Sequence, residues 1–179
     1  MIPTLDRIHT LWSIYKLPDN KRIHCSKVAS VCRFIADQYG KSGIPIQTEL
    51  LLAGALLHDI DKNVLKKSGE QHPDAAVRIL KHEGMDEVAH LVTTHPLHAI
   101  MDPSISPKTL EEKILFLSDK MVKYEVLTVD KRFALWQKER LPRQEREILR
   151  KSYPFVKALE RQIFSEIQTD SQKVIQYVH

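Results

Sequence analysis

An apolar segment that stops abruptly at charged residues limits the possible folds of this chain more than any other stretch. Residues 51–63 read LLAGALLHDIDKN, so a run of apolar and small residues leads directly into His58 and Asp59. A helix that is apolar on so many sides has to be buried along most of its surface. A buried carboxylate without a partner is costly, and such groups are normally neutralised by a partner or by a metal. Other parts of the chain are therefore expected to supply partners for His58 and Asp59.

Helical periodicity extends over nearly the whole chain, and no alternating run of β-branched residues indicates a strand. Thr48 stands where a helix is expected to begin, and Gly84 stands where one is expected to end. The expected helices are residues 4–15, 21–40, 48–58, 73–84, 86–95, 107–124, 130–139 and 143–167. Residues 97–107 are expected to form a long connection, and residues 168–179 are expected to fray. The predicted fold class is all-α, with the helix over residues 48–58 innermost.

Composition and length indicate one globular domain. The 179 residues are 42% hydrophobic and 28% charged, which is ordinary for a globular protein. A chain of this length is most simply one domain. We expect a single domain over residues 1–179, with a core at about 20–125 and a C-terminal helical extension at about 126–179.

The cysteines and the apolar runs predict where the protein resides. Cys25 and Cys32 lie two turns apart on one expected helix, too far for an easy disulfide. The first residues lack the basic and apolar regions of a signal peptide. The longest apolar run, residues 50–57, is much shorter than the ~20 residues that span a bilayer. We therefore expect a cytoplasmic protein with reduced thiols and no membrane association.

The charge of the chain suits an anionic small molecule better than nucleic acid. The formal net charge is +4, and the isoelectric point is about 9.0. The basic residues are interleaved with Asp and Glu rather than clustered, so a nucleic-acid partner is not expected.

Nine histidines justify a search for metal ligands. His24 falls near the start of the second expected helix, and Asp119 adjoins the apolar stripe of the helix over residues 107–124. Imidazole mixed with carboxylate suits Zn²⁺, Fe²⁺ or Mn²⁺. Together with His58 and Asp59, these residues would supply the donors of one metal site.

Two further histidines could extend this set to a second metal. His72 precedes the fourth expected helix, and His95 ends the fifth. With them there are six ligands, enough for two ions that share Asp59. A two-metal site can generate hydroxide and stabilise both the attacking and the leaving oxygen in phosphoryl transfer. Spacing alone leaves the number of metals open, because a single buried histidine is more often a hydrogen-bonded core residue than a ligand.

The order of these residues resembles the HD superfamily of metal-dependent phosphohydrolases. RIHCSKVASVCRFIA resembles the helix of the first histidine, LLAGALLHDIDK the apolar helix that ends in HD, and ILFLSDKM the helix of the last aspartate. The resemblance implies an HD-domain helical bundle with additional C-terminal helices. It also implies a phosphohydrolase that acts on a nucleotide or a related phosphate ester or anhydride through a metal-bound hydroxide. The ligands implied for the first metal are His24, His58, Asp59 and Asp119.

Within the superfamily the chain is similar to the small HDIG-type proteins, which include the symmetrical diadenosine-tetraphosphate hydrolases. These carry two histidines between HD and the last aspartate, where QHPDAAVRIL and LVTTHPLHAI place His72 and His95. That group holds a di-iron centre, so the resemblance implies two divalent ions, with iron first and Mn, Zn, Mg or Co as alternatives. Asp61 stands where HDIG has glycine, and HPLH stands where the group has H-T-x-G.

Asp59, Lys62 and Lys120 are the expected catalytic residues. Each lysine follows an expected ligand, so its ammonium could stabilise the charge on a transferring phosphoryl group. Exposed lysines at helix ends are an equally good interpretation, because lysine is rarely buried. Asp61 either orients a ligating histidine or faces solvent, and His98 is either a further ligand or a loop residue.

Two other functions could use the same residues. An HD-fold di-iron oxygenase shares the six ligands, and a non-catalytic regulatory domain would bind a nucleotide without turnover. Retention of every ligand argues against the regulatory domain, and turnover without O₂ would distinguish the hydrolase from the oxygenase. The expected partner is a small phosphate substrate, a nucleotide first, and a homodimer is the protein assembly that we consider.

Overall fold

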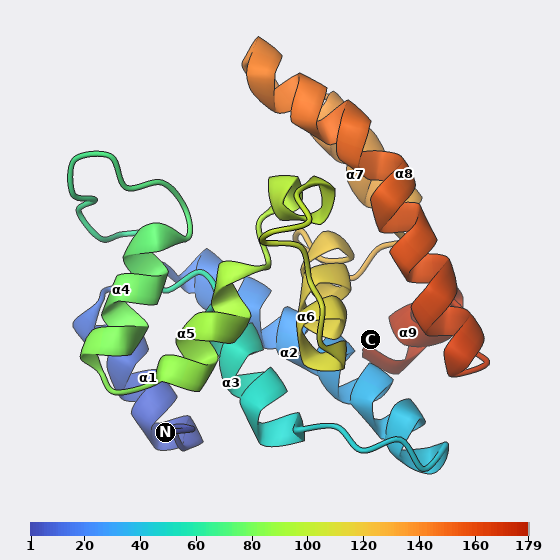
Figure 1. Cartoon of the computed structure of the whole chain (residues 1–179), viewed down its shortest axis with the longest axis horizontal. Coiled ribbons are helices and arrows are strands. Elements are labelled where there is room, and N and C mark those ends of the chain that lie inside the picture. Colours follow the sequence, from blue (N-terminus) through green and yellow to red (C-terminus); the bar gives the residue numbers. More distant parts are fainter. Residues whose placement is uncertain (179) are drawn as a thin grey trace.

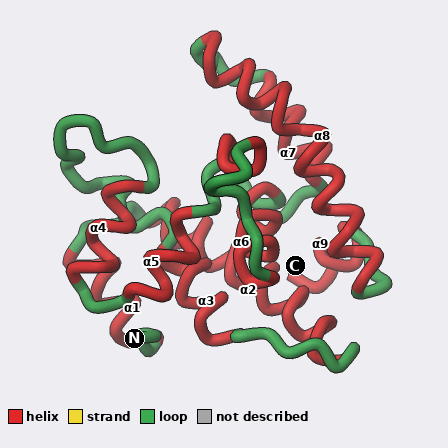
Figure 2. The backbone as a smooth tube through the Cα atoms, in the orientation of Figure 1, coloured by secondary structure: helices red, strands yellow, loops and turns green. Residues whose placement is uncertain are grey.

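Helices account for the regular structure in residues 1–178, which are the residues that the computed structural model describes (Figure 2). No strand occurs in that range, which confirms the all-α prediction. The helices are α1 (Leu5–Ile14), α2 (Asp19–Lys41), α3 (Thr48–Leu57), α4 (Asp74–His82), α5 (Asp86–Thr93), the 3₁₀ helix η1 (Leu97–Met101), α6 (Leu110–Lys120), α7 (Val129–Gln137), α8 (Arg143–Glu166) and α9 (Ser171–Val178). No helix in the described part of the chain is both long and apolar enough to cross a bilayer.

Helix α3 lies at the centre of the bundle, as its apolar sequence predicts (Figure 1). It packs against α2, α5 and α6, and its Leu51 and Ala55 side chains are fully buried. Helix α5 comes close to α3 at Gly54, where a Cβ would lie only 2.5 Å from Leu91 Cδ2. The end of α3 is therefore held deep in the bundle, where the His-Asp pair follows it.

The prediction that the C-terminal residues fray is wrong for the part that is described. Residues 171–178 form α9, which packs on α2. Val174 is fully buried, and the Tyr177 ring lies 4.8 Å from the Phe34 ring of α2. A helix this short is only marginally stable alone and depends on tertiary packing. The sequence of residues 171–178 does not by itself indicate that packing. His179 lies outside the described residues.

Most predicted helix ends are correct to within about two residues, and two other segments differ more clearly from the prediction. The helix expected to reach Tyr124 ends at Lys120, and the chain then makes a tight turn in which Val122 and Val126 form an isolated antiparallel bridge. The connection expected over residues 97–107 contains the 3₁₀ helix η1. Asp119 consequently lies in the last turn of its helix.

Helices α7 and α8 form an extension on one side of the bundle (Figure 1). Helix α8 packs on η1 and α6, and α7 packs on α8. Lys157 of α8 forms an ion pair with Asp130 of α7 at 2.8 Å. These contacts hold α7 beside the end of α6, where Asp119 lies.

Candidate metal centre

The side chains expected to bind metal converge from five segments of the chain. They are His24 of α2, His58 and Asp59 at the end of α3, His72 before α4, His95 after α5 and Asp119 of α6. Two groups of donors have ligand atoms within 4.8 Å of one another: His24, His58 and Asp59 in the first, and Asp59, His72 and His95 in the second. Asp59 belongs to both groups.

Asp119 completes the first group. Its Oδ1 lies 3.0 Å from His24 Nε2 and 3.5 Å from His58 Nε2, and the two Nε2 atoms are 3.3 Å apart. In the second group, His72 Nε2 lies 2.8 Å from His95 Nε2 and 3.6 Å from Asp59 Oδ1. The four imidazoles thus direct Nε2 atoms towards the two carboxylates.

Backbone carbonyls orient two of these imidazoles. His58 Nδ1 donates to the Ala55 carbonyl at 2.8 Å, and His95 Nδ1 donates to the Val92 carbonyl at 2.6 Å. Because a carbonyl oxygen only accepts, Nδ1 carries the proton, and in the neutral ring the Nε2 lone pair faces the cluster. A histidine that binds a metal through Nε2 needs this arrangement.

A buried carboxylate orients a third imidazole. Asp61 is 2% exposed, and each of its oxygens lies 3.1 Å from His72 Nδ1. This geometry excludes the solvent-facing interpretation of Asp61. It leaves Nε2 of His72 directed at His95 and Asp59.

We expect Asp61→Ala to weaken metal binding by the second group about 10–100-fold, the usual effect of losing a partner that orients a ligand. The first group should keep its affinity, because Asp61 contacts His72 and not His24 or His58. Calorimetric titration of the metal-free protein with Mn²⁺ would measure the affinities of both donor groups. Asp61→Asn retains a hydrogen-bond acceptor, so its metal affinity should fall less. Unchanged metal binding by Asp61→Ala would show that this carboxylate does not position His72.

Asp59 is held in its ionised form by its neighbours. Burial alone would raise its pKa, but the positive charges of His58, Lys62 and Lys21 hold the pKa far below its usual value. Lys21 Nζ lies 2.9 Å from Oδ2, and Lys62 Nζ lies 3.1 Å from Oδ1. Lys21 was not among the predicted site residues, although it precedes His24 by one helical turn.

The imidazoles differ in their affinity for protons. Burial lowers the pKa of His95 well below its usual value, and the adjacent charges of His58 and His72 lower it further. Burial also opposes protonation of His58, but Cys25 and Asp59 outweigh burial and hold the His58 pKa well above its usual value. A divalent cation bound at His58 would displace the proton from Nε2, because only a deprotonated imidazole nitrogen can bind a metal.

Lys120 is buried rather than exposed at a helix end. It is 2% exposed, its ammonium contacts the Asp119 carboxylate, and it donates to the His95 carbonyl at 2.7 Å. Burial would raise the pKa of Asp119, but Lys120 and His24 hold it well below its usual value. Lys120 therefore connects two of the ligand-bearing segments.

A cavity of about 360 Å³ opens onto the cluster, and we call it the metal cavity. Its walls include the exposed His98, and Arg132 and Trp136 of α7. No sequence motif links the two α7 residues to the cluster. They reach it through the packing of α7 on α8 and of α8 on α6.

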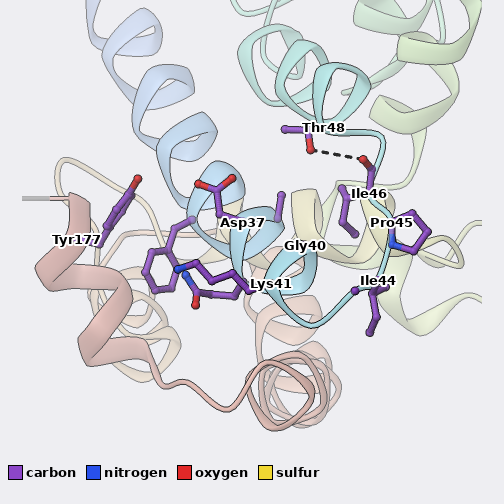
Figure 3. A pocket seen from close by; sticks show the side chains of 12 residues that line it. Asp37, Gly40, Lys41, Ile44, Pro45, Ile46, Thr48 and Tyr177 are labelled. Atoms are coloured by element: carbon purple, nitrogen blue, oxygen red, sulfur yellow. Dashed lines mark hydrogen bonds between the residues drawn. The ribbon is translucent and has the colours of Figure 1, made fainter.

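A larger hollow of about 770 Å³ lies at the other end of α2 (Figure 3). Asp37 and Lys41 of α2, the loop that carries Pro45, and Tyr177 of α9 line it. Among residues 1–178, no histidine lines this hollow, and Asp37 is the one acidic residue that does. The metal donors thus lie at the smaller cavity.

Comparison with known proteins places most of the chain in one family. A family model described as HD domain matches residues 22–123. No curated protein and no solved structure matches the chain. The matched range contains all six donor residues and ends before α7.

Proposed function

We propose that the chain, which belongs to the HD domain family, is a metal-dependent phosphohydrolase that acts on a small phosphate ester or anhydride, with nucleotides as the first candidates. The observation that carries this proposal is the position of Asp59. Its carboxylate belongs to both donor groups and lies in the wall of a cavity that Lys21 and Lys62 also line. A site with shared carboxylate donors and surplus cations suits a substrate with phosphate oxygens.

The donor set fits two divalent ions. The first would be held by His24, His58, Asp59 and Asp119, and the second by Asp59, His72 and His95. Mixed imidazole and carboxylate donors suit Fe²⁺, Mn²⁺ and Zn²⁺, and we propose iron first, with Mg and Co as further alternatives. When bound, such ions lower the pKa of a water molecule and stabilise the oxygens of a transferring phosphoryl group.

Lys21 and Lys62 are the residues that we assign to the substrate. Both line the metal cavity, and their side chains are 33% and 30% exposed. A partly exposed ammonium can turn from Asp59 towards a phosphate oxygen, where it stabilises negative charge in the transition state. Lys120 has no such freedom, so we assign it to positioning Asp119.

We expect protein loaded with Mn²⁺ or Fe²⁺ to hydrolyse p-nitrophenyl phosphate or a member of a nucleotide panel that includes diadenosine tetraphosphate, without O₂. Lys62→Met should lower turnover at least about tenfold, because a cation that stabilises phosphoryl charge is lost, and should leave the metal content unchanged. Lys66→Met, an exposed lysine on the same loop, is the matched control and should retain full turnover.

Two outcomes would refute the hydrolase. The first is consumption of O₂ with an organic substrate and no turnover of any phosphate compound, which would support the oxygenase. The second is nucleotide binding without turnover under any metal, which would support a regulatory domain.

A further inference from the structure

A second cavity adjoins the metal cavity on the side of α7. It has a volume of about 290 Å³, and we call it the side cavity. Lys21, His24, Arg132 and Trp136 line both cavities. A molecule bound at the metal cluster could therefore extend past Lys21 and His24 into the side cavity.

The guanidinium of Arg132 is buried where the two cavities meet, and part of its hydrogen-bonding capacity is not used. It is 8% exposed, its Nε donates to the Val122 carbonyl at 3.1 Å, and its buried Nη1 has no hydrogen-bond partner among residues 1–178. Nearby acids are engaged elsewhere, since Asp119 pairs with Lys120. Glu139, the acid that lines the side cavity, pairs with Lys123. A buried arginine is normally paired, so this arrangement calls for an explanation.

Trp136 holds the guanidinium in a fixed orientation. The guanidinium carbon of Arg132 lies 3.6 Å from the centre of the Trp136 ring system, a contact that offsets part of the cost of burying the charge. The Phe133 ring packs edge-on with Trp136 at 5.4 Å between centroids. Since the guanidinium covers one face of the indole, that face is closed to a nucleobase, while N–H donors of the guanidinium remain free.

We propose that the side cavity binds a second phosphate group of the substrate, with the Arg132 guanidinium as its principal contact. This inference rests on the proposed function and narrows its substrate class to compounds with two linked phosphate groups, in preference to phosphate monoesters. The planar fork of an arginine matches two phosphate oxygens at once, which a lysine ammonium cannot do. Lys21 lies where it can contact the bridge between the two phosphates, because it lines both cavities.

Binding measurements separate this role from a structural one. The probes are methylenediphosphonate, which has two linked phosphonates and no hydrolysable bridge, and inorganic phosphate. Each is titrated calorimetrically into the Mn²⁺-loaded protein, with a parallel titration into Mn²⁺ alone to correct for chelation. Arg132→Met should weaken methylenediphosphonate binding at least about tenfold, as expected for loss of a hydrogen bond to a charged group. It should weaken phosphate binding less than about twofold, because the metal cluster is intact.

Two further variants keep the test decisive. Arg146→Met removes the same charge from an exposed position on α8 and should leave both affinities unchanged. Arg132→Lys keeps the positive charge but lacks the planar fork, so it should weaken binding of methylenediphosphonate by a smaller factor. If Arg132→Met does not fold, the affinities of Arg132→Lys for the two probes provide the test. Equal weakening of both probes, or of neither, would overturn the proposal, since Arg132 would then serve only to fix α7 to the turn at Val122. Binding of the diphosphonate through Arg132 without turnover of any phosphate compound would keep the subsite and refute the hydrolase.

Discussion

Asp59→Ala should abolish metal binding and turnover together. Asp59 is the residue common to both donor groups, so alanine would remove a ligand and a balancing negative charge from each of the two ions that we propose. We expect the metal content to fall from two equivalents to near zero, and turnover to fall at least about a thousandfold, because the hydrolysis that we propose would depend on both ions. Inductively coupled plasma mass spectrometry and a phosphate-release assay on the same preparation would measure the two effects.

The control for this variant is Asp37→Ala. Asp37 is an exposed carboxylate near the other end of α2, and its loss should change neither metal content nor turnover. Thermal unfolding of both variants would show that the fold is retained, since Lys21 and Lys62 can reach water when Asp59 is absent. Retention of two equivalents of metal by Asp59→Ala would contradict the bridging role.

His95→Ala should remove about one equivalent of metal and leave the other in place. His95 Nε2 faces His72 Nε2 at 2.8 Å, and the second donor group loses one of its three members with this change. The first group keeps its four donors and should retain its ion, by the dependence of affinity on ligand number. Turnover should fall severely even though one ion remains, because two ions are needed to stabilise both reacting oxygens.

His98→Ala is a close match for His95→Ala. His98 lines the same cavity three residues further along the chain, but it is exposed, and it should be dispensable for metal content. An unchanged stoichiometry in His95→Ala would show that the centre holds one ion and that His95 is a structural residue. Loss of metal in His98→Ala would instead identify His98 as a ligand.

Local patterns were sufficient to predict the all-α fold and the central helix. The apolar run of α3 requires burial on nearly every side, and caps and glycines mark the ends of most other helices. Helix α9 was not predicted because a helix this short depends on tertiary packing. It packs on α2, where the Tyr177 ring meets the Phe34 ring and Val174 is buried. The early end of α6 is followed by the pairing of Val122 with Val126, a contact that helical periodicity does not predict.

The site residues that could be predicted are those next to the apolar segments of helices. His58 and Asp59 follow an apolar helix directly, and Asp119 adjoins an apolar stripe, so each is drawn inward by the burial of its own helix. Arg132 and Trp136 carry no comparable signal, because α7 reaches the cavity only through contacts of α8 with η1 and α6. Burial of Lys120 was equally hard to predict, since one of its two partners is the backbone carbonyl of His95, which is distant in the sequence.

The convergence of five segments on one cluster has a topological consequence for the unfolded chain. His24 and Asp119 meet at 3.0 Å although 95 positions separate them in sequence. Ligands brought together over such distances close long loops, so a shared ion would act as a cross-link comparable to a disulfide. A cross-link formed only in the native state stabilises that state by mass action. Removal of the ions would therefore free α2 and α6 to separate, so the residues that serve the reaction would also set the temperature at which the bundle comes apart.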